Sequence, residues 1–236
     1  MAKHGKRYAE SIAQVDRFRD YEPREAFELL KDLPSANFDE TVEVHMRLGV
    51  DPRHADQQVR ETVTLPEGTG TTVRIMAFVE GEAAREAEEA GADYVGVDEY
   101  VEKIEDGWVD FDVAIAVPQA MGKIGRLGRI LGPRGLMPSP RSGTMVQPDD
   151  IADTIEALRK GRVEFRVDRT GNVHIPIGKK SFTVDELMNN FVTVMQIVWR
   201  ARPPAVSGGS YIRRLTFATT MSPGVRVDVS AARDLV

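Results

Sequence analysis

The sequence predicts a protein of mixed α/β and α+β class, in which both ends of the chain form a split α+β domain and an α/β domain is inserted between them. Its 236 residues, 42% of them hydrophobic, can supply two modest cores. Strand and helix patterns alternate at short spacing through the middle of the chain, which indicates βαβ units and a parallel sheet. Amphipathic strands, with one clear helix on each side, precede and follow that block.

The N-terminal part predicts one helix and two strands. Residues 23–33, PREAFELLKDL, begin with a proline in the first turn, and one helical face carries Ala26, Phe27, Leu30 and Leu33. Residues 38–50 alternate as a half-buried strand whose inner side carries Val42, Val44, Met46 and Leu48. A turn at Asp51-Pro52 and a short polar helical piece then lead to a second strand in RETVTLP, residues 60–66.

The middle of the chain predicts alternating strands and helices. Residues 71–79, TTVRIMAFV, form an apolar run typical of a strand that is buried on both faces. Helix patterns follow at 82–91 and 98–107, and strand patterns at 92–97 and 111–118. Glycine or proline recurs every three or four residues through 121–144, which predicts a loop, and a further helix pattern covers 149–161.

The C-terminal part returns to strands. Strand patterns at 162–167 and 172–178 flank a turn at Thr170-Gly171. A long helix follows from about Val184 to Ala201, with a capping box at Thr183 and Glu186 and a stop at Pro203-Pro204. Its buried stripe is Leu187, Phe191, Val194, Met195 and Val198. Residues 210–229 predict a final hairpin that turns at MSPG, residues 221–224.

The domain boundaries follow from the need to close a core. The first part has too few strands and helices to do so alone, so the simplest arrangement joins it to the last part. We therefore predict one domain from residues 1–67 and 160–236, and a second from the inserted residues 68–159. The two chain crossings, at Gly68–Gly70 and at Gly161, predict a hinge.

Composition excludes several kinds of protein. There is no cysteine, which rules out disulfides and thiolate metal sites and favours a cytoplasmic location. No stretch reaches the roughly 20 apolar residues of a membrane span, so we expect no membrane partner. The net charge of −6 argues against nucleic acid, but residues 73–113 hold 3 basic and 13 acidic residues whereas 114–148 hold 5 basic and none acidic. A local nucleic-acid surface is therefore compatible with the acidic total.

An α/β enzyme that binds a small ligand in the inserted domain is the alternative function. The glycines at 122, 125 and 128 contain no G-x-G, and the first strand of the block is followed by an acidic run. The sequence GKKS at 178–181 lacks the earlier glycine of a phosphate-binding loop. A lone strand histidine is more often a surface or core residue than a general base, and no metal-ligand spacing links His4, His45, His54 and His174. We predict no catalytic residue, no metal and no cofactor.

The glycine-rich stretch GRLGRILGPRGLMPSP, residues 125–140, resembles the signature of the ribosomal protein L-one family. Similar segments occur in the family's order over essentially the whole chain: KHGKRY at 3–8, NFDETVEVHMRLGVDPRHADQQVRETVTLPEGTG at 37–70, EEAGADYVG at 88–96, DGWVDFDVAIA at 106–116, GRVEFRVDRTGNVHIPIGKKSF at 161–182 and TTMSPGVRVD at 219–228. The resemblance implies a split α+β domain with an inserted Rossmann-like domain, which agrees with the strand pattern.

The resemblance also implies a function. It indicates a cytoplasmic constituent of the 50S ribosomal subunit, a monomer when free, that binds large-subunit ribosomal RNA at the mobile stalk. It further implies help in releasing deacylated tRNA from the exit site, and repression of translation by binding the messenger RNA of its own operon.

Two sets of candidate RNA contacts follow. The resemblance implies contact at Phe38, Thr41, Lys179, Ser181, Gly209, Thr220 and Met221, and the polar side chains beside them add Arg47 and Thr219. The alternative for each is ordinary, with Phe38 in the edge of a core, the threonines as strand formers and Met221 as a gap filler. A secondary basic face is Lys123, Arg126, Arg129, Arg134 and Arg141, where the glycines could instead serve only to turn the chain.

Three positions depart from the family pattern. Asn37 and Gly208 stand where the family usually has lysine, and Ser222 stands where it usually has glycine. Each of the first two removes a potential phosphate contact, and Ser222 predicts a less close approach of backbone to RNA.

Overall fold

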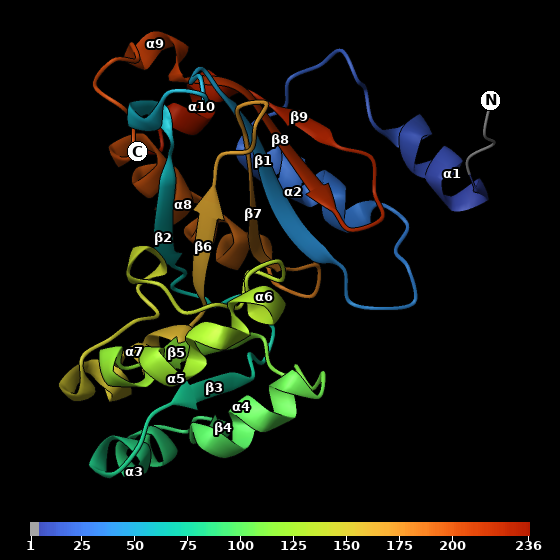
Figure 1. Ribbon diagram of the computed structural model, residues 1–236. Coiled ribbons are helices and arrows are strands. Elements are labelled where there is room, and N and C mark those ends of the chain that lie inside the picture. Colours follow the sequence, from blue (N-terminus) through green and yellow to red (C-terminus); the bar gives the residue numbers. More distant parts are fainter. Residues whose placement is uncertain (1–4) are drawn as a thin grey trace. The chain divides into compact units, whose positions relative to one another are not determined.

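The computed structural model describes residues 5–236, apart from the side chain of Arg141, and the chain forms two compact units (Figure 1). Unit 1 combines the residues up to Gly70 with Gly161–Val236, and unit 2 is Thr71–Lys160. The predicted mixture of α/β and α+β structure is confirmed. No helix in the described part of the chain has the length and apolar character needed to cross a membrane.

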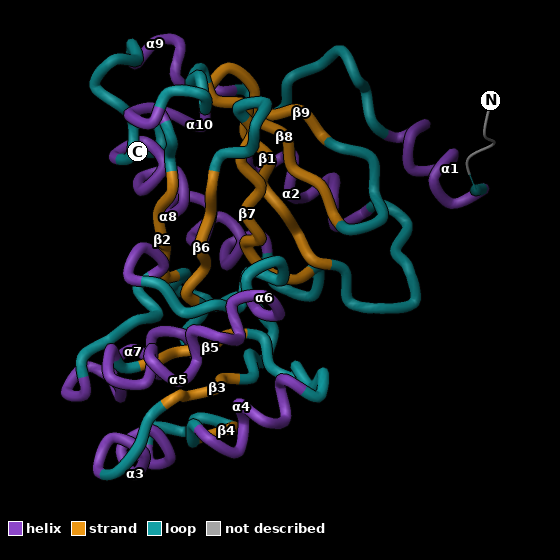
Figure 2. The backbone as a smooth tube through the Cα atoms, viewed as in Figure 1, coloured by secondary structure: helices purple, strands orange, loops and turns teal. Residues whose placement is uncertain are grey.

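Unit 1 is built on an antiparallel sheet with strand order β7-β1-β8-β9, next to a two-stranded sheet of β2 and β6 (Figure 2). Its strands are β1 (Thr41–Leu48), β2 (Arg60–Thr64), β6 (Arg162–Arg166), β7 (Asn172–Lys179), β8 (Ile212–Thr219) and β9 (Val225–Val227). Its helices are α1 (Lys6–Gln14), α2 (Pro23–Asp32), α8 (Val184–Arg200), α9 (Gly208–Tyr211) and α10 (Val229–Arg233), with a short 3-10 turn η1 (Ala55–Gln57).

The core of unit 1 lies between the larger sheet and helices α2 and α8, which are drawn behind it in Figure 1. The strand β1 buries Val42, Val44, Met46 and Leu48, as its alternating pattern predicts. At the centre the rings of Phe27 and Phe217 stack with centroids 4.2 Å apart, and Phe191 meets Phe217 edge-on at 4.9 Å. The predicted capping box of α8 is also present: the Thr183 hydroxyl accepts from the Glu186 backbone, and the Glu186 side chain accepts from the Thr183 backbone.

The strands β6 and β7 follow each other in sequence but join different sheets. The strand β6 pairs with β2, whereas β7 pairs with β1. The turn between them is held by Asp168, whose carboxylate accepts hydrogen bonds from the backbone of Thr170 and Asn172, both at 2.8 Å. These bonds lower the pKa of Asp168 well below its ordinary value; the backbone bond from Asn172 is the largest cause, and burial opposes it.

A buried asparagine on α8 was not expected from the sequence. Asn190 donates to the carbonyl oxygens of Gly68 at 3.0 Å and Ile177 at 2.8 Å, and its side-chain oxygen accepts from the backbone of Glu67 at 3.0 Å. The side chain therefore satisfies three backbone groups where the chain leaves β2 beside β7, which explains a polar residue within an apolar stripe.

Unit 2 has the predicted parallel sheet, in the order β4-β3-β5. Its strands are β3 (Ile75–Phe78), β4 (Tyr94–Val95) and β5 (Val113–Ala116). Helix α3 packs against α7, and α4 packs against α5. The helices are α3 (Glu82–Glu89), α4 (Asp98–Glu105), α5 (Met121–Ile124), α6 (Gly128–Leu131) and α7 (Ile151–Arg159); the 3-10 turns are η2 (Pro118–Ala120), η3 (Gly125–Leu127), η4 (Pro140–Ser142) and η5 (Pro148–Asp150).

The first part of the glycine-rich stretch is helical, so the prediction of a loop there is wrong. The segments η2, α5, η3 and α6 follow one another from Pro118 to Leu131, and Gly125 and Gly128 have right-handed helical angles with φ of −54° and −55°. Each glycine in a helix costs about 1 kcal/mol relative to alanine. Burial of Ile124, Leu127 and Leu131 in the core of unit 2 offsets that cost.

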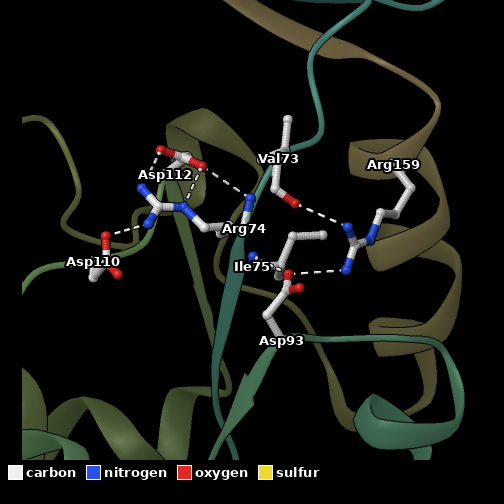
Figure 3. Close-up of polar contacts among 7 residues, drawn as sticks. All are labelled: Val73, Arg74, Ile75, Asp93, Asp110, Asp112 and Arg159. Atoms are coloured by element: carbon white, nitrogen blue, oxygen red, sulfur yellow. Dashed lines mark hydrogen bonds and ion pairs between the residues drawn. The ribbon is translucent and has the colours of Figure 1, made fainter.

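Two arginines fix the ends of unit 2 (Figure 3). Arg74, before β3, pairs with Asp110 and with Asp112 on the segment that precedes β5. Arg159, at the end of α7, donates to the carbonyl oxygen of Val73 at 3.0 Å and to the carboxylate of Asp93 at 2.9 Å. Arg159, near the end of the inserted segment, is therefore bonded to Val73, near its start.

We expect the substitution Gly161→Ala to destabilise unit 1 strongly. Gly161 has φ of +94°, and a Cβ atom there would lie 2.7 Å from Cα of Gly68, so strain and a backbone clash would add. The matched control is Gly107→Ala, where φ is +101° but no atom lies within 4 Å of the added Cβ. The control should cost about 1–2 kcal/mol. Urea unfolding of the unit that holds each glycine should show a larger loss for Gly161→Ala, and equal losses would contradict the clash.

Candidate nucleic-acid interface

Three strand ends meet at one edge of the larger sheet. The strand β1 runs antiparallel to both neighbours, so Thr41 lies opposite Lys179 of β7, and Val42 lies opposite Thr219 of β8. This pairing places the start of β1 beside the ends of β7 and β8. We call the exposed and half-buried residues there the edge patch: Phe38, Thr41, Lys179, Ser181, Thr220 and Met221.

The carboxylate of Glu40 organises the edge patch from beneath. Glu40 is only 1% exposed, and its Oε1 accepts from the backbone N–H of Ala36 at 2.6 Å. Its Oε2 accepts from the hydroxyl of Thr219 and from the backbone N–H of Met221, the latter at 3.1 Å. One buried side chain therefore connects the segment before β1 to the turn after β8, about 180 positions later in the chain.

These bonds keep Glu40 ionised. Burial by itself raises the pKa of the carboxyl, but the bonds from Thr219, Ala36 and Met221 and the charge of Lys180 together outweigh burial. The pKa of Glu40 is therefore lowered. A buried carboxylate with several donors is stable only in the geometry that satisfies it, so Glu40 also fixes the positions of its partners.

Hydrogen bonds across the strands position the polar part of the edge patch. The Thr220 hydroxyl accepts from the backbone N–H of Thr41 at 3.0 Å, and the Lys179 ammonium donates to the Thr41 hydroxyl at 2.9 Å. On the adjoining turn, the Ser181 hydroxyl donates to the carboxylate of Asp39 at 2.7 Å. The patch thus presents one cation and several hydroxyl groups.

The edge patch also exposes two apolar side chains. Phe38 is 53% exposed and Met221 is 47% exposed, although Phe38 lies between Ala36 and Glu40 in the chain and the backbone N–H of Met221 itself bonds to Glu40. The alternatives of Phe38 as an edge-of-core residue and of Met221 as a gap filler do not describe such exposed side chains.

Three of the candidate RNA contacts are not part of the edge patch. Thr219 is only 5% exposed and its hydroxyl donates to Glu40, so its side chain supports the patch instead of facing outward. Arg47 lies opposite Arg214 near the other end of β1, and Gly209 lies in α9, before β8 begins. The strands separate these two residues from the edge patch.

Ser222 has a local partner in the turn after β8. Its hydroxyl accepts from the backbone N–H of Thr219 at 2.9 Å and donates to the carbonyl oxygen of Pro223 at 3.0 Å. The serine that departs from the family pattern therefore helps to close the turn that carries Met221.

The secondary basic face is partly neutralised. Lys123 pairs with Glu80 at 2.6 Å and Asp98 at 2.9 Å, and Arg126 pairs with Glu105 at 3.0 Å. Arg129 and Arg134 are exposed, and the side chain of Arg141 lies outside the described residues. The acidic residues of unit 2 thus hold two of its basic side chains in place.

Two histidines that appear unrelated in sequence meet on the sheet. His45 and His174 lie opposite each other in β1 and β7, with their Nδ1 atoms 2.7 Å apart. Only the strand register could have revealed this pair. In the part of the chain that the structure describes, no group of three or more histidine and carboxylate side chains could hold a metal ion.

Comparison with known proteins identifies the family. Residues 29–223 match the model of the ribosomal protein L1p/L10e family. The chain is 54% identical over 231 residues to large ribosomal subunit protein uL1 of Thermomicrobium roseum, a match that covers 98% of this chain and 95% of that protein. It is 53% and 54% identical over 236 residues to the uL1 proteins of Chloroflexus aggregans and Chloroflexus aurantiacus, covering 100% of this chain and 99% of each relative.

The family resemblance seen in the sequence segments is therefore confirmed over nearly the full length. The same matches decide against the enzyme alternative. The chain belongs to the ribosomal protein L1p/L10e family, whose members are structural ribosomal proteins and not enzymes.

Proposed function

We propose that the protein is a constituent of the large ribosomal subunit and binds large-subunit ribosomal RNA through the edge patch of unit 1. The observation that carries this proposal is the exposure of Phe38 and Met221 beside Lys179, in segments far apart in sequence that Glu40 holds together. A buried carboxylate that orders an exposed apolar and cationic surface is typical of a prearranged binding site.

The chemistry of the edge patch suits structured RNA. Such RNA is recognised through its shape, its 2′-hydroxyls and its phosphates. The hydroxyls of Thr41 and Thr220 can bond to ribose, the Lys179 ammonium can neutralise a phosphate, and the Phe38 ring can stack on an exposed base. The names of the relatives, large ribosomal subunit protein uL1, support the same partner.

The family supports two finer proposals. On the ribosome at the mobile stalk, the protein would assist release of deacylated tRNA from the exit site, with Arg129 and Arg134 of unit 2 as the exposed cations for that contact. Free in the cytoplasm as a monomer, it would repress translation by binding its own operon messenger. If the messenger folds like the site on the ribosomal RNA, the edge patch would bind either of them. The messenger and the ribosomal RNA should then compete for the protein.

The proposed function is tested by nuclease footprinting of the purified protein on the large-subunit ribosomal RNA of Chloroflexus aurantiacus. One compact protected segment is the expected result. Protection that is absent or spread evenly over the RNA would contradict specific binding. A fragment that spans the protected segment then serves as the probe for the variants below, and the leader of the operon messenger serves as its competitor.

We also propose that unit 1 alone carries the ribosomal RNA contact. Replacing Thr71–Lys160 by a short glycine linker should be tolerated, because the two crossings already approach each other at Gly68 and Gly161. Circular dichroism should show a folded product that retains most of the RNA affinity in filter binding. A folded product without affinity would place the main contact in unit 2.

The variants Thr220→Ala and Lys179→Ala should weaken RNA binding in different ways. Loss of the Thr220 hydroxyl should cost roughly 1–3 kcal/mol of affinity without changing the slope of log affinity against log salt, because the group is uncharged. Loss of Lys179 should lower that slope by about one, as expected for one phosphate contact. Filter binding across a salt series separates the two. Wild-type affinity for Thr220→Ala would remove this residue from the interface.

The substitution Glu40→Gln should destabilise unit 1 at neutral pH and weaken RNA binding. The amide NH2 would face a backbone donor, so we expect a loss of about 1–3 kcal/mol in unfolding free energy. The pKa of Glu40 is lower folded than unfolded, so the ionised group stabilises the fold above its ordinary value of 4.5 and loses this effect as the pH falls through its folded pKa.

The difference in unfolding free energy between wild type and Glu40→Gln should therefore shrink as the pH falls below 4.5, measured by urea unfolding. The matched control is Glu43→Gln, three positions later in the chain, on the half-exposed face of β1. This control should change stability by less than about 0.5 kcal/mol. A pH-independent loss for Glu40→Gln would show that the ionised carboxylate is not the source of its stabilisation.

A further inference from the structure

A hollow of about 200 Å³ lies on the outer face of the larger sheet of unit 1. The side chains around it alternate with the buried positions of β1, so they face away from the core that α2 and α8 cover. Three adjacent strands contribute two polar residues each: His45 and Arg47 from β1, Asn172 and His174 from β7, and Arg214 and Thr216 from β8. All of these residues can donate hydrogen bonds.

Two arginines face each other across this hollow. Arg47 of β1 lies directly opposite Arg214 of β8, and like charges in that position destabilise a sheet. Two other arginines on these sheets do have carboxylate partners: Arg226 pairs with Asp20, and Arg60 pairs with Glu164. Within residues 5–236, Arg47 and Arg214 have no such partner, which leaves two positive charges side by side.

The two histidines lie on the side of the hollow formed by β1 and β7. His45 and His174 contact each other through Nδ1, while their Nε2 atoms lie 3.8 Å from the carboxylate of Glu43 and 3.9 Å from that of Asp168. Within residues 5–236, these two carboxylates lie near the imidazoles, and neither of them pairs with Arg47 or Arg214. A planar guanidinium pair is the arrangement that binds phosphate with paired hydrogen bonds.

We propose that this hollow binds a phosphate group of the RNA backbone, held by Arg47 and Arg214 as a second contact beside the edge patch. The inference rests on the proposed RNA-binding function. Thr41 and Arg47 are six positions apart in β1, roughly 20 Å at about 3.3 Å per residue, so one folded RNA segment can reach both places. A phosphate there removes the repulsion between the two arginines, which explains their pairing across the strands.

The test compares Arg214→Gln with Arg200→Gln, using the footprinted fragment of ribosomal RNA. Arg200 is an exposed cation at the end of α8, so the control makes the same change of charge away from the hollow. Arg214→Gln should reduce affinity about tenfold, as for one charge-assisted hydrogen bond, and should lower the salt slope by about one. Arg200→Gln should change neither, and Arg214→Lys should restore the slope but not the full affinity.

A second measurement separates RNA backbone from free phosphate. Inorganic phosphate is titrated into the protein while the imidazole resonances of His45 and His174 are followed by NMR. Weak shifts at millimolar phosphate that disappear in Arg214→Gln support the proposal. If wild type binds inorganic phosphate tightly but Arg214→Gln leaves the salt slope of RNA binding unchanged, the hollow is a site for a free anion. That result would overturn the proposal.

Failure of this inference differs from failure of the proposed function. If Arg214→Gln binds RNA with wild-type affinity and slope while Thr220→Ala is weakened, the hollow is not an RNA contact and the edge patch stands. If wild type itself does not bind the ribosomal RNA, both assignments are wrong. Circular dichroism melting of each variant ensures that a lost fold is not mistaken for a lost contact.

Discussion

The buried carboxylate of Glu40 is the interaction on which the candidate interface depends. An ionised group out of water is tolerated only while its donors surround it, so the segments of Ala36 and Met221 must be held together whenever unit 1 is folded. This requirement fixes the backbone on either side of the exposed residues Phe38 and Met221. The entropy cost of ordering these segments is met during folding, so it does not reduce the free energy of binding.

The strand β1 imposes a second constraint because it lies between β7 and β8. Its outward residues Glu43, His45 and Arg47 each have a cross-strand neighbour on both sides, and Thr41 has one in β7. The strand β1 therefore contributes residues to both the edge patch and the hollow. A slip of one residue would exchange the inner and outer faces and expose Val44 and Met46. The packing of these residues against α2 and α8 therefore fixes the register, and the register in turn positions the polar outer face.

The acidic net charge does not decide where RNA could bind. At physiological ionic strength, screening limits the interaction between exposed charges to a range of about 8 Å. The charges near a binding surface therefore matter more than the net charge of the chain. In unit 2 the acidic side chains pair with Lys123, Arg126, Arg74 and Arg159. On the sheet of unit 1, by contrast, Arg47 and Arg214 have no carboxylate partner in the described part of the chain. The net charge therefore does not show that basic side chains are paired in unit 2 while, among the described residues, two arginines on the sheet of unit 1 are not.

The sequence by itself determined the family and most of the strands and longer helices. The period-two pattern of β1, the capping box of α8 and the βαβ rhythm of unit 2 depend on neighbours in the chain, so they can be recognised without a structure. The edge patch residues were also identifiable, but only through the resemblance to the family. Phe38 or Met221 taken alone gives no local sign that it will be exposed.

The tertiary structure decided what depends on distant partners. Glu40 and Glu43 look alike in the sequence, yet one is buried beneath donors from the far end of the chain and the other lies on a half-exposed face. The run from Met121 to Leu131 is helical despite its glycines, because the core of unit 2 takes up its apolar face. The pairing of β6 with β2, of His45 with His174 and of Arg47 with Arg214 likewise follows from strand register, which is set by packing across the sheet and not by any local signal.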